Sequence, residues 1–213
     1  MKIGLFGGTF NPIHIGHLAL AENVTASLGL DMMFLIPSKI PPHKSGSGII
    51  DPVKRLKMVE LVAEGLGEKF KVSDYEIAAD GVSYTLKTLK HFRRLYPDDE
   101  IFFACGTDIF ASIHKWHAYE ELFKYANFVV VSRSMVSFGK MLEAIPERLH
   151  DIVIREEQFA GEKSGRVILH EMPPVDVSST DIREVLEASY RKANLPDVVY
   201  EYISEKGLYR GDE

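Results

Sequence analysis

The chain has 213 residues, of which 46% are hydrophobic and 26% are charged, a balance typical of an ordinary globular protein. Its formal charge of −6 argues against a broad surface for nucleic acid or anionic membranes, and no apolar run reaches the roughly 18 residues of a membrane-spanning helix. Cys105 is the only cysteine, which excludes an internal disulfide and a cysteine-based zinc site. We therefore expect one domain spanning residues 1–213, in the cytoplasm, with neither nucleic acid nor membrane as a partner.

Apolar runs predict strands, and apolar residues at helical spacing predict helices between them. In chain order we expect a strand at 3–6, a helix from 16 or 17 to 28, a strand at 32–37, a helix at 52–65, a strand at 71–72, a helix at 85–96, a strand at 101–105, a helix at 119–125, a strand at 128–131, a helix at 140–149, a strand at 167–169 and two final helices, from 178 or 179 to 190 and from 196 to 205. Pro52 suits the first turn of its helix, and Gly29 stands where a left-handed residue commonly ends one. The stretch 38–48, rich in Pro, Gly and Ser, is typical of a loop.

The predicted strands are apolar throughout and alternate with helices, which indicates a parallel sheet covered on both faces. We therefore predict an α/β fold: a doubly wound, Rossmann-like, mostly parallel sheet with helices on both faces and a helical C-terminal part. In such a sheet, ligands bind at the carboxyl ends of the strands, where the strand order reverses. Functional residues are therefore expected directly after strands. Cys105 lies inside a predicted strand and is expected to belong to the core rather than to act as a nucleophile.

The strongest functional signal is the string GGTFNPIHIGH at residues 7–17, between the first strand and the first helix. Glycines at this junction let backbone N–H groups approach phosphate oxygens, and the helix N-terminus adds partial positive charge. His14 and His17 are three residues apart, so both rings can point at one spot. Two glycines alone could form an ordinary turn, and a lone histidine could be a packed or capping residue. The complete string at this place favours nucleotide binding, and we assign to it Gly7, Gly8, Thr9, Phe10, His14 and His17.

This string resembles the signature of the nucleotidyltransferase superfamily, and further strings follow in the order of one of its families: IPPHK (40–44), SYT (83–85), GTD (106–108), KW (115–116), VSSTDIR (177–183) and GLY (207–209). Together they make residues 2–210 similar to the bacterial nicotinate-nucleotide adenylyltransferases. The segment 134–166 is less alike, and Asn11 stands where the family more often has Asp. The resemblance implies transfer of AMP from ATP to nicotinate mononucleotide, giving deamido-NAD and pyrophosphate in NAD biosynthesis. It also implies Mg²⁺ carried by the ATP phosphates, so no metal site in the protein is expected.

The chemistry of that reaction suits these residues. The attacking phosphate oxygen is already ionised at neutral pH, so the protein's task is positioning and charge stabilisation. We expect His14, His17 and Arg183 to be the catalytic residues, with the two histidines donating hydrogen bonds to the bridging phosphates. Ser178, Thr180 and Arg183 would bind the β- and γ-phosphates at a helix N-terminus. The alternative for this segment is an ordinary capped helix with an exposed arginine.

Gly106 and Asp108 complete the expected ATP site, with the carboxylate near a ribose hydroxyl; the alternative for Asp108 is a helix cap. Four residues are expected to bind nicotinate mononucleotide: Lys44, Tyr84, Thr85 and Trp116. Each has a simpler alternative, namely a solvated loop lysine for Lys44, a helix cap for the segment 83–85, and a core residue for Trp116. We expect nicotinate to be preferred over its amide, because a helix beginning near Tyr119 would present N–H donors to a carboxylate, helped by Lys115.

Other activities also fit parts of the pattern. The string HIGH at 14–17 is shared with class I aminoacyl-tRNA synthetases, but the chain is short, acidic and lacks a KMSKS loop. An adenylyltransferase acting on nicotinamide mononucleotide or phosphopantetheine is a further alternative, as is a catalytically silent nucleotide sensor. Pyrophosphate release from ATP with each acceptor separates these hypotheses. The sequence leaves the oligomeric state open.

Overall fold

The computed structural model describes residues 1–42, 48–132, 137–189, 192 and 194–210. Its elements are, in chain order, β1 (Lys2–Gly8), α1 (Ile15–Ser27), β2 (Met32–Pro37), α2 (Pro52–Leu66), β3 (Phe70–Val72), α3 (Tyr75–Ala78), α4 (Thr85–Leu95), β4 (Glu100–Gly106), α5 (Thr107–Phe110), α6 (Tyr119–Leu122), β5 (Asn127–Ser132), α7 (Phe138–Ala144), β6 (Val153–Arg155), β7 (Val167–Glu171), α8 (Ser179–Ser189) and α9 (Asp197–Glu205). Short 3-10 helices lie at Ile113–Lys115, Glu147–Ile152 and Glu156–Gln158.

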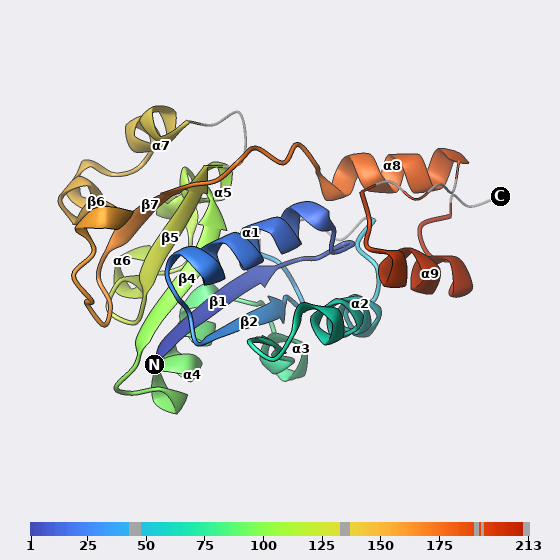
Figure 1. Ribbon diagram of the computed structural model, residues 1–213, viewed down its shortest axis with the longest axis horizontal. Helices are drawn as coiled ribbons and strands as arrows, with labels where there is room; N and C mark the ends of the chain where they lie inside the picture. Colours follow the sequence, from blue (N-terminus) through green and yellow to red (C-terminus); the bar gives the residue numbers. More distant parts are fainter. Residues whose placement is uncertain (43–47, 133–136, 190–191, 193, 211–213) are drawn as a thin grey trace.

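The strands form one parallel sheet in the order β3-β2-β1-β4-β5-β7-β6 (Figure 1). The first strand is central: Leu5 pairs with Phe34 of β2 on one side and with Phe103 of β4 on the other. From β1 the chain winds outward to β3, then returns to β4 and winds toward the opposite edge. The strand order therefore reverses between β1 and β4, which confirms the predicted doubly wound, Rossmann-like sheet.

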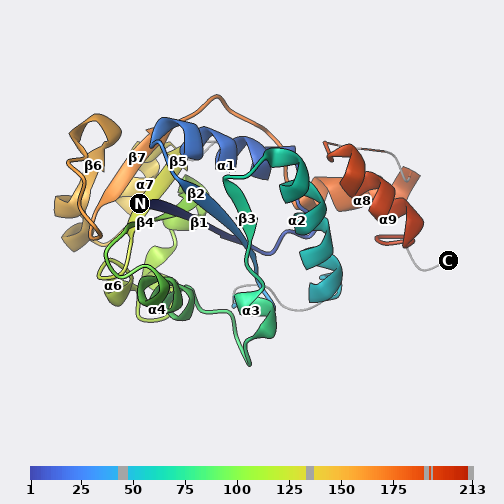
Figure 2. The same ribbon diagram turned by 60° about the horizontal axis from the view of Figure 1, so that its bottom comes forward.

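Both faces of the sheet are covered, because residues of β4 alternate between two separate hydrophobic clusters. Phe102 and Ala104 pack on the side of α1 and α2. Ile101, Phe103 and Cys105 pack on the side of α4 and α6. Figure 2 shows α1 above the sheet and α4 and α6 below it. Cys105 is 5% exposed, so its predicted place in the core is confirmed.

The ends of two long helices follow from their sequences. Helix α1 is followed by Gly29 at a φ of 60°, and the Leu30 N–H donates to the Thr25 carbonyl across this left-handed turn. Helix α2 begins at Pro52, directly after Asp51, whose carboxylate accepts from two backbone N–H groups of the first turn. Both boundaries agree with the predicted ones.

The two C-terminal helices lie together at one end of the molecule, beyond α2 (Figure 1). Val199 and Ile203 of α9 are completely buried in the cluster that also holds Met58 and Val59 of α2. After β7 the chain thus crosses back to pack its last helix against α2. In the part of the chain that is described, no helix combines the length and apolarity needed to cross a membrane.

The segment 134–166 differs most from the expectation. The predicted helix 140–149 is two elements, α7 and a 3-10 helix. Pro146 separates them, because proline has no backbone N–H to donate within a continuing helix. The strand β6 was not predicted, since three residues carry no recognisable alternation.

Helix α6 ends at Leu122 rather than at residue 125. Helix α8 is described to Ser189, and its predicted last residue, 190, lies outside the described residues.

Candidate active site

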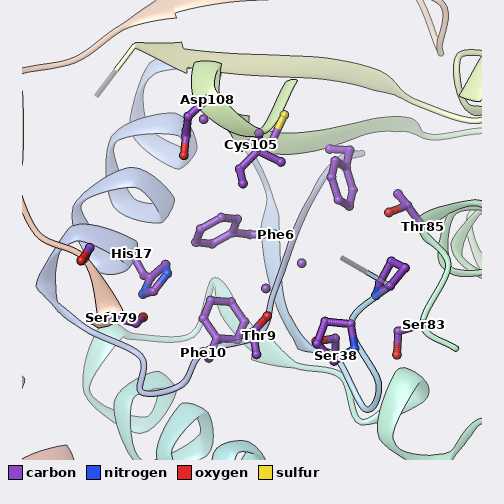
Figure 3. A pocket seen from close by; sticks show the side chains of 18 of the residues that line it. Phe6, Thr9, Phe10, His17, Ser38, Ser83, Thr85, Cys105, Asp108 and Ser179 are labelled. Carbon is purple, nitrogen blue, oxygen red and sulfur yellow. The ribbon is translucent and has the colours of Figure 1, made fainter. Parts of the chain in front are cut away.

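A cavity of about 610 Å³ opens at the carboxyl ends of β1 and β4, where the strand order reverses. Gly7 and Gly8 line it from β1, and Cys105 and Gly106 line it from β4. This volume is in the range of small-molecule sites, and the position is the one expected for a doubly wound sheet. In Figure 3, His17 and Ser179 lie on one side of the cavity and Ser38, Ser83 and Thr85 on the other, with Phe6 between them.

The predicted nucleotide-binding loop after β1 is tightly packed. A Cβ atom on Gly8 would lie 2.8 Å from a ring carbon of Phe10, so only glycine fits there. Phe10 has a φ of 48°, and its ring is 1% exposed. That ring meets Phe6 and His17 edge-on, with ring centroids 5.6 Å and 5.1 Å away. The close packing fixes the backbone of the loop at the cavity wall, where Thr9 also lies.

The two predicted histidines lie together at the start of α1. Their rings are 3.7 Å apart between centroids, and both line the cavity. The backbone N–H of His14 donates to Nδ1 of His17 at 3.2 Å. Since Nδ1 accepts this bond, a neutral His17 carries its proton on Nε2. The arrangement can thus present an N–H donor to an anion.

The segment that begins α8 reaches the same cavity. Ser178 and Thr180 line it, as expected for ATP-binding residues. Arg183 is held just behind them: its Nη1 donates to the carbonyls of Asn11 (2.9 Å) and Ser179 (3.1 Å). Arg183 is not among the residues that line the cavity, so its phosphate-binding role stays a prediction.

Asp108 is exposed and lines the cavity from the first turn of α5. The residue that caps this helix is Gly106, so the alternative assignment of Asp108 as an N-cap is wrong. The carboxylate of Asp108 faces the same space as His17 in Figure 3. Its expected contact with a ribose hydroxyl stays a prediction.

The segment 83–85 forms the opposite wall. Ser83 Oγ accepts from the backbone N–H of Lys39 at 3.0 Å. Tyr84 occupies the N-cap position of α4, but its side chain makes no capping hydrogen bond, so the cap alternative holds for the backbone of this segment and not for its hydroxyls. The rings of Tyr84 and His117 stack with centroids 4.5 Å apart. Tyr84, Thr85 and His117 all line the cavity.

Trp116 contacts the core and also lines the cavity, and its stacking on a nicotinate ring stays a prediction. Its ring packs edge-on against Phe103 and Phe128, at centroid distances of 6.2 and 6.5 Å, and it also lines the cavity. Its Nε1 is buried and has no hydrogen-bond partner within the described ranges. Neither Lys115 nor Tyr119 lines the cavity, and α6 has only four residues. The helix-terminus explanation for a preference for the acid therefore loses its geometric basis, since a helix this short has little dipole.

Sequence reasoning missed several polar residues of the cavity, among them Ser38 and Glu76. Ser38 directly follows β2 and is 7% exposed, and its Oγ has no partner among the residues that the structure describes. Its position after a strand could have identified it. The Glu76 carboxylate accepts from Thr88 Oγ1 at 2.5 Å, and burial raises its pKa. No sequence signal distinguishes Glu76 from a surface glutamate.

Two expectations concern groups that the structure does not place. Lys44 lies outside the described residues, so its substrate contact stays a prediction. Across the described ranges, no group of three or more His, Cys, Asp or Glu side chains is arranged to hold a metal ion. The carboxylates of Asp108 and Asp176 both line the cavity and are oxygen donors of the type that hard divalent cations prefer.

The sequence is similar to curated proteins over its whole length. A cytidylyltransferase-like family model matches residues 5–185. A probable nicotinate-nucleotide adenylyltransferase of Shewanella pealeana is 38% identical over 216 residues, which cover 100% of this chain and 97% of the relative. A probable nicotinate-nucleotide adenylyltransferase of Clostridium tetani is 37% identical over 210 residues, covering 98% and 99%.

The fold is also similar to solved structures. A Plasmodium falciparum nicotinic acid mononucleotide adenylyltransferase complexed with NaAD aligns with a TM-score of 0.76, covering 98% of this chain and 97% of that one. The same enzyme complexed with APC aligns with a TM-score of 0.74, covering 98% and 96%. Both are 18% identical to this chain, so they show a common fold.

Proposed function

The chain belongs to the family of nicotinate-nucleotide adenylyltransferases, and we propose that the cavity between β1 and β4 is where it carries out their reaction. It is a nucleotidyltransferase of NAD biosynthesis that transfers AMP from ATP to nicotinate mononucleotide, giving deamido-NAD and pyrophosphate. The observation that carries the placement is the close pair of His14 and His17 rings beside the glycine loop, at the reversal of the strand order.

The reaction joins a phosphate oxygen of the mononucleotide to the α-phosphorus of ATP, while the bond from that phosphorus to the bridging oxygen breaks. No base is required, because a phosphate monoester is already ionised at neutral pH. Negative charge grows on the bridging oxygen as pyrophosphate leaves. We assign His14 and His17 to donate hydrogen bonds to this charge, which is the kind of electrostatic stabilisation that lowers such barriers most.

ATP would lie along the wall formed by the glycine loop and the start of α8. Backbone N–H groups of Gly7 to Phe10 face its phosphates, and Gly106 and Asp108 lie near its ribose. Ser178 and Thr180 offer hydroxyls at the start of α8, and Arg183 lies one turn further, bonded to the loop itself. A triphosphate that extends along the first turn of α8 would meet the Arg183 guanidinium there.

Nicotinate mononucleotide would occupy the opposite side of the cavity. The half-buried ring of Trp116 and the Tyr84–His117 stack supply flat apolar surfaces for a pyridine ring. Thr85 and Ser38 supply hydroxyls on this side. Ser38 Oγ and Trp116 Nε1 are buried and have no partner among the described residues, and a bound substrate would supply one. Lys44 stays a candidate for its phosphate.

Nucleotidyltransferases of this family generally use a divalent metal together with ATP. We propose Mg²⁺, bound mostly by ATP phosphates and water, with Asp108 and Asp176 as the protein carboxylates that could meet its hydration shell. The ion would neutralise phosphate charge and help to orient the triphosphate. We also propose that residues 1–213 act as one domain and that the protein works in the cytoplasm, as its composition and single cysteine suggest.

The test is pyrophosphate release from ATP and Mg²⁺ with three acceptors in parallel: nicotinate mononucleotide, nicotinamide mononucleotide and phosphopantetheine. We expect nicotinate mononucleotide to give the highest kcat/KM. Equal values for acid and amide would indicate dual specificity. Pyrophosphate release that occurs with phosphopantetheine but with neither mononucleotide would overturn the assignment. Release that needs no acceptor would overturn it as well. Omitting Mg²⁺, or replacing it with Mn²⁺, tests the metal separately.

A further inference from the structure

The string GLY at 207–209 has no role in the reaction described so far, yet it reaches the nucleotide-binding loop. The Tyr209 hydroxyl donates to the side chain of Asn11, whose backbone carbonyl in turn binds Arg183. We propose that Tyr209 is a positioning residue for ATP, acting through Asn11 on Arg183. The inference rests on the proposed function, because it takes Arg183 to be a ligand of the triphosphate.

The side chain of Asn11 is 2% exposed and uses all of its polar atoms. Its Oδ1 accepts from the Tyr209 hydroxyl at 2.9 Å and from the Ile50 N–H at 3.2 Å. Its Nδ2 donates to the Gly48 carbonyl at 2.8 Å. Two donors on one side and an acceptor on the other fix the orientation of the amide. An aspartate could keep the two accepted bonds, but it could not donate to Gly48.

The main chain at Asn11 and Pro12 is the anchor of α8. The Asn11 carbonyl accepts from Arg183 Nη1 at 2.9 Å, and the Pro12 carbonyl accepts from Ser179 Oγ at 3.1 Å. The side chain and the carbonyl of Asn11 belong to one residue, so rotation of its side chain and reorientation of its peptide are coupled. The position of Arg183 therefore depends on the bonds that hold the Asn11 amide.

Tyr209 is built to keep its hydroxyl in this place. Its backbone is left-handed, with a φ of 60°, a conformation that is uncommon for residues other than glycine and is retained only where the surroundings hold it. Burial raises the pKa of the Tyr209 phenol, so the hydroxyl stays protonated and remains a donor throughout the pH range of an assay. The guanidinium groups of Arg55 and Arg183 lower that pKa, but burial is the larger effect.

This arrangement affects the two substrates unequally. Arg183 and the glycine loop lie on the proposed ATP side, whereas Tyr84, Thr85 and Trp116 belong to elements that have no hydrogen bond to Asn11 in the described part of the chain. Ser38 and Lys44 belong to the segment after β2 that also holds Gly48 and Ile50, and removing the Tyr209 hydroxyl leaves the bonds of Asn11 to those two residues in place. Loss of the Tyr209 hydroxyl should therefore weaken binding of ATP and leave binding of the mononucleotide nearly unchanged. A residue that only stabilised the fold would instead lower kcat by reducing the folded fraction, with both KM values preserved.

The experiment compares Tyr209→Phe with Tyr202→Phe, a matched removal of a hydroxyl in the neighbouring helix α9. For Tyr209→Phe we expect the KM for ATP to rise about three- to tenfold, the effect of one neutral hydrogen bond, while kcat and the KM for the mononucleotide change less than twofold. Tyr202→Phe should leave all three unchanged. An equal rise in both KM values, an unchanged KM for ATP, or the same effect in Tyr202→Phe would overturn the proposal.

A second set of variants covers the case in which Tyr209→Phe does not fold. Asn11→Asp keeps the acceptor for Tyr209, so its KM for ATP should lie closer to wild type than that of Asn11→Ala. Where the double variant folds, Tyr209→Phe should add less than a further twofold rise in the Asn11→Ala background. Full additivity would refute action through Asn11. A wild-type protein that released no pyrophosphate from ATP would refute the proposed function, whereas an active wild type with an unaffected Tyr209→Phe would refute this inference alone.

Discussion

Arg55 is a buried cation whose only described hydrogen bonds go to carbonyl oxygens, and replacing it with methionine should damage both the stability of the protein and its ATP site. The side chain is completely buried. Its three nitrogens donate to the carbonyls of Thr9 (2.6 Å), Ile50 (3.1 Å) and Lys39 (3.2 Å). One guanidinium thus joins the glycine loop to both ends of the loop between β2 and α2.

The magnitude follows from the carbonyls that the substitution leaves without a donor. A buried polar group without a partner costs about 1–3 kcal/mol, so three carbonyls would cost about 3–9 kcal/mol. Thr9 lines the cavity, where water can replace the lost donor, and methionine removes the desolvation of a charge. We therefore expect the lower limit, a loss of about 3 kcal/mol in the free energy of unfolding. Urea denaturation followed by fluorescence measures it.

A matched control is Arg93, which also binds carbonyls, those of Tyr125, Asp99 and Lys163 among them, but lies away from the cavity. Arg93→Met should lower the free energy of unfolding without changing the KM for ATP. Arg55→Met should change both, because Thr9 belongs to the nucleotide-binding loop. A loss below about 1 kcal/mol for Arg55→Met, or an unchanged KM for ATP in its folded fraction, would refute this reasoning.

Three further predictions concern single side chains. His17→Ala should lower kcat by about 10²- to 10³-fold with little change in Tm, as expected for loss of a transition-state donor; a near-normal kcat would contradict the catalytic assignment. Arg183→Ala should raise the KM for ATP and lower kcat/KM strongly, and unchanged ATP affinity would place the triphosphate elsewhere. Burial raises the pKa of Glu76, so the folded protein binds this proton more tightly than the unfolded chain, and stability should fall as pH rises from the ordinary carboxyl pKa through the raised one. Glu76→Gln should flatten that fall when the free energy of unfolding is measured against pH. Curves identical to those of the wild type would show that Glu76 does not cause the fall.

Local patterns in the sequence were sufficient to predict six of the seven strands of the sheet, all but β6, and the position of the cavity. The runs at β1, β4 and β5 are apolar throughout because both faces of those strands are buried, so their composition alone marks them. Gly7, Gly8, Gly106 and Asp108 each lie at or just after such a run, and parallel strands bring these ends to one edge of the sheet.

Contacts between distant residues could not be predicted in the same way. Arg55 lies in the string PVKRLK, where it looks like one of several surface cations, and only the carbonyls brought to it by the fold make it a core residue. Glu76 is similar, since its partner Thr88 belongs to another helix. The polar neighbours of Trp116 in the sequence favour a substrate-binding ring over a core residue. Its neighbours in space include Phe103 and Phe128, which the sequence does not bring together.

The hydrogen bond between Tyr209 and Asn11 joins residues 198 positions apart, and the bonds from α8 to the same loop span 172 and 167 positions. During synthesis from the N-terminus, β1, β2 and β4 can pair long before these partners exist. The glycine loop can therefore gain these bonds only after residue 209 has left the ribosome. Affinity for ATP should then appear later in folding than the pairing of the strands that carry the site.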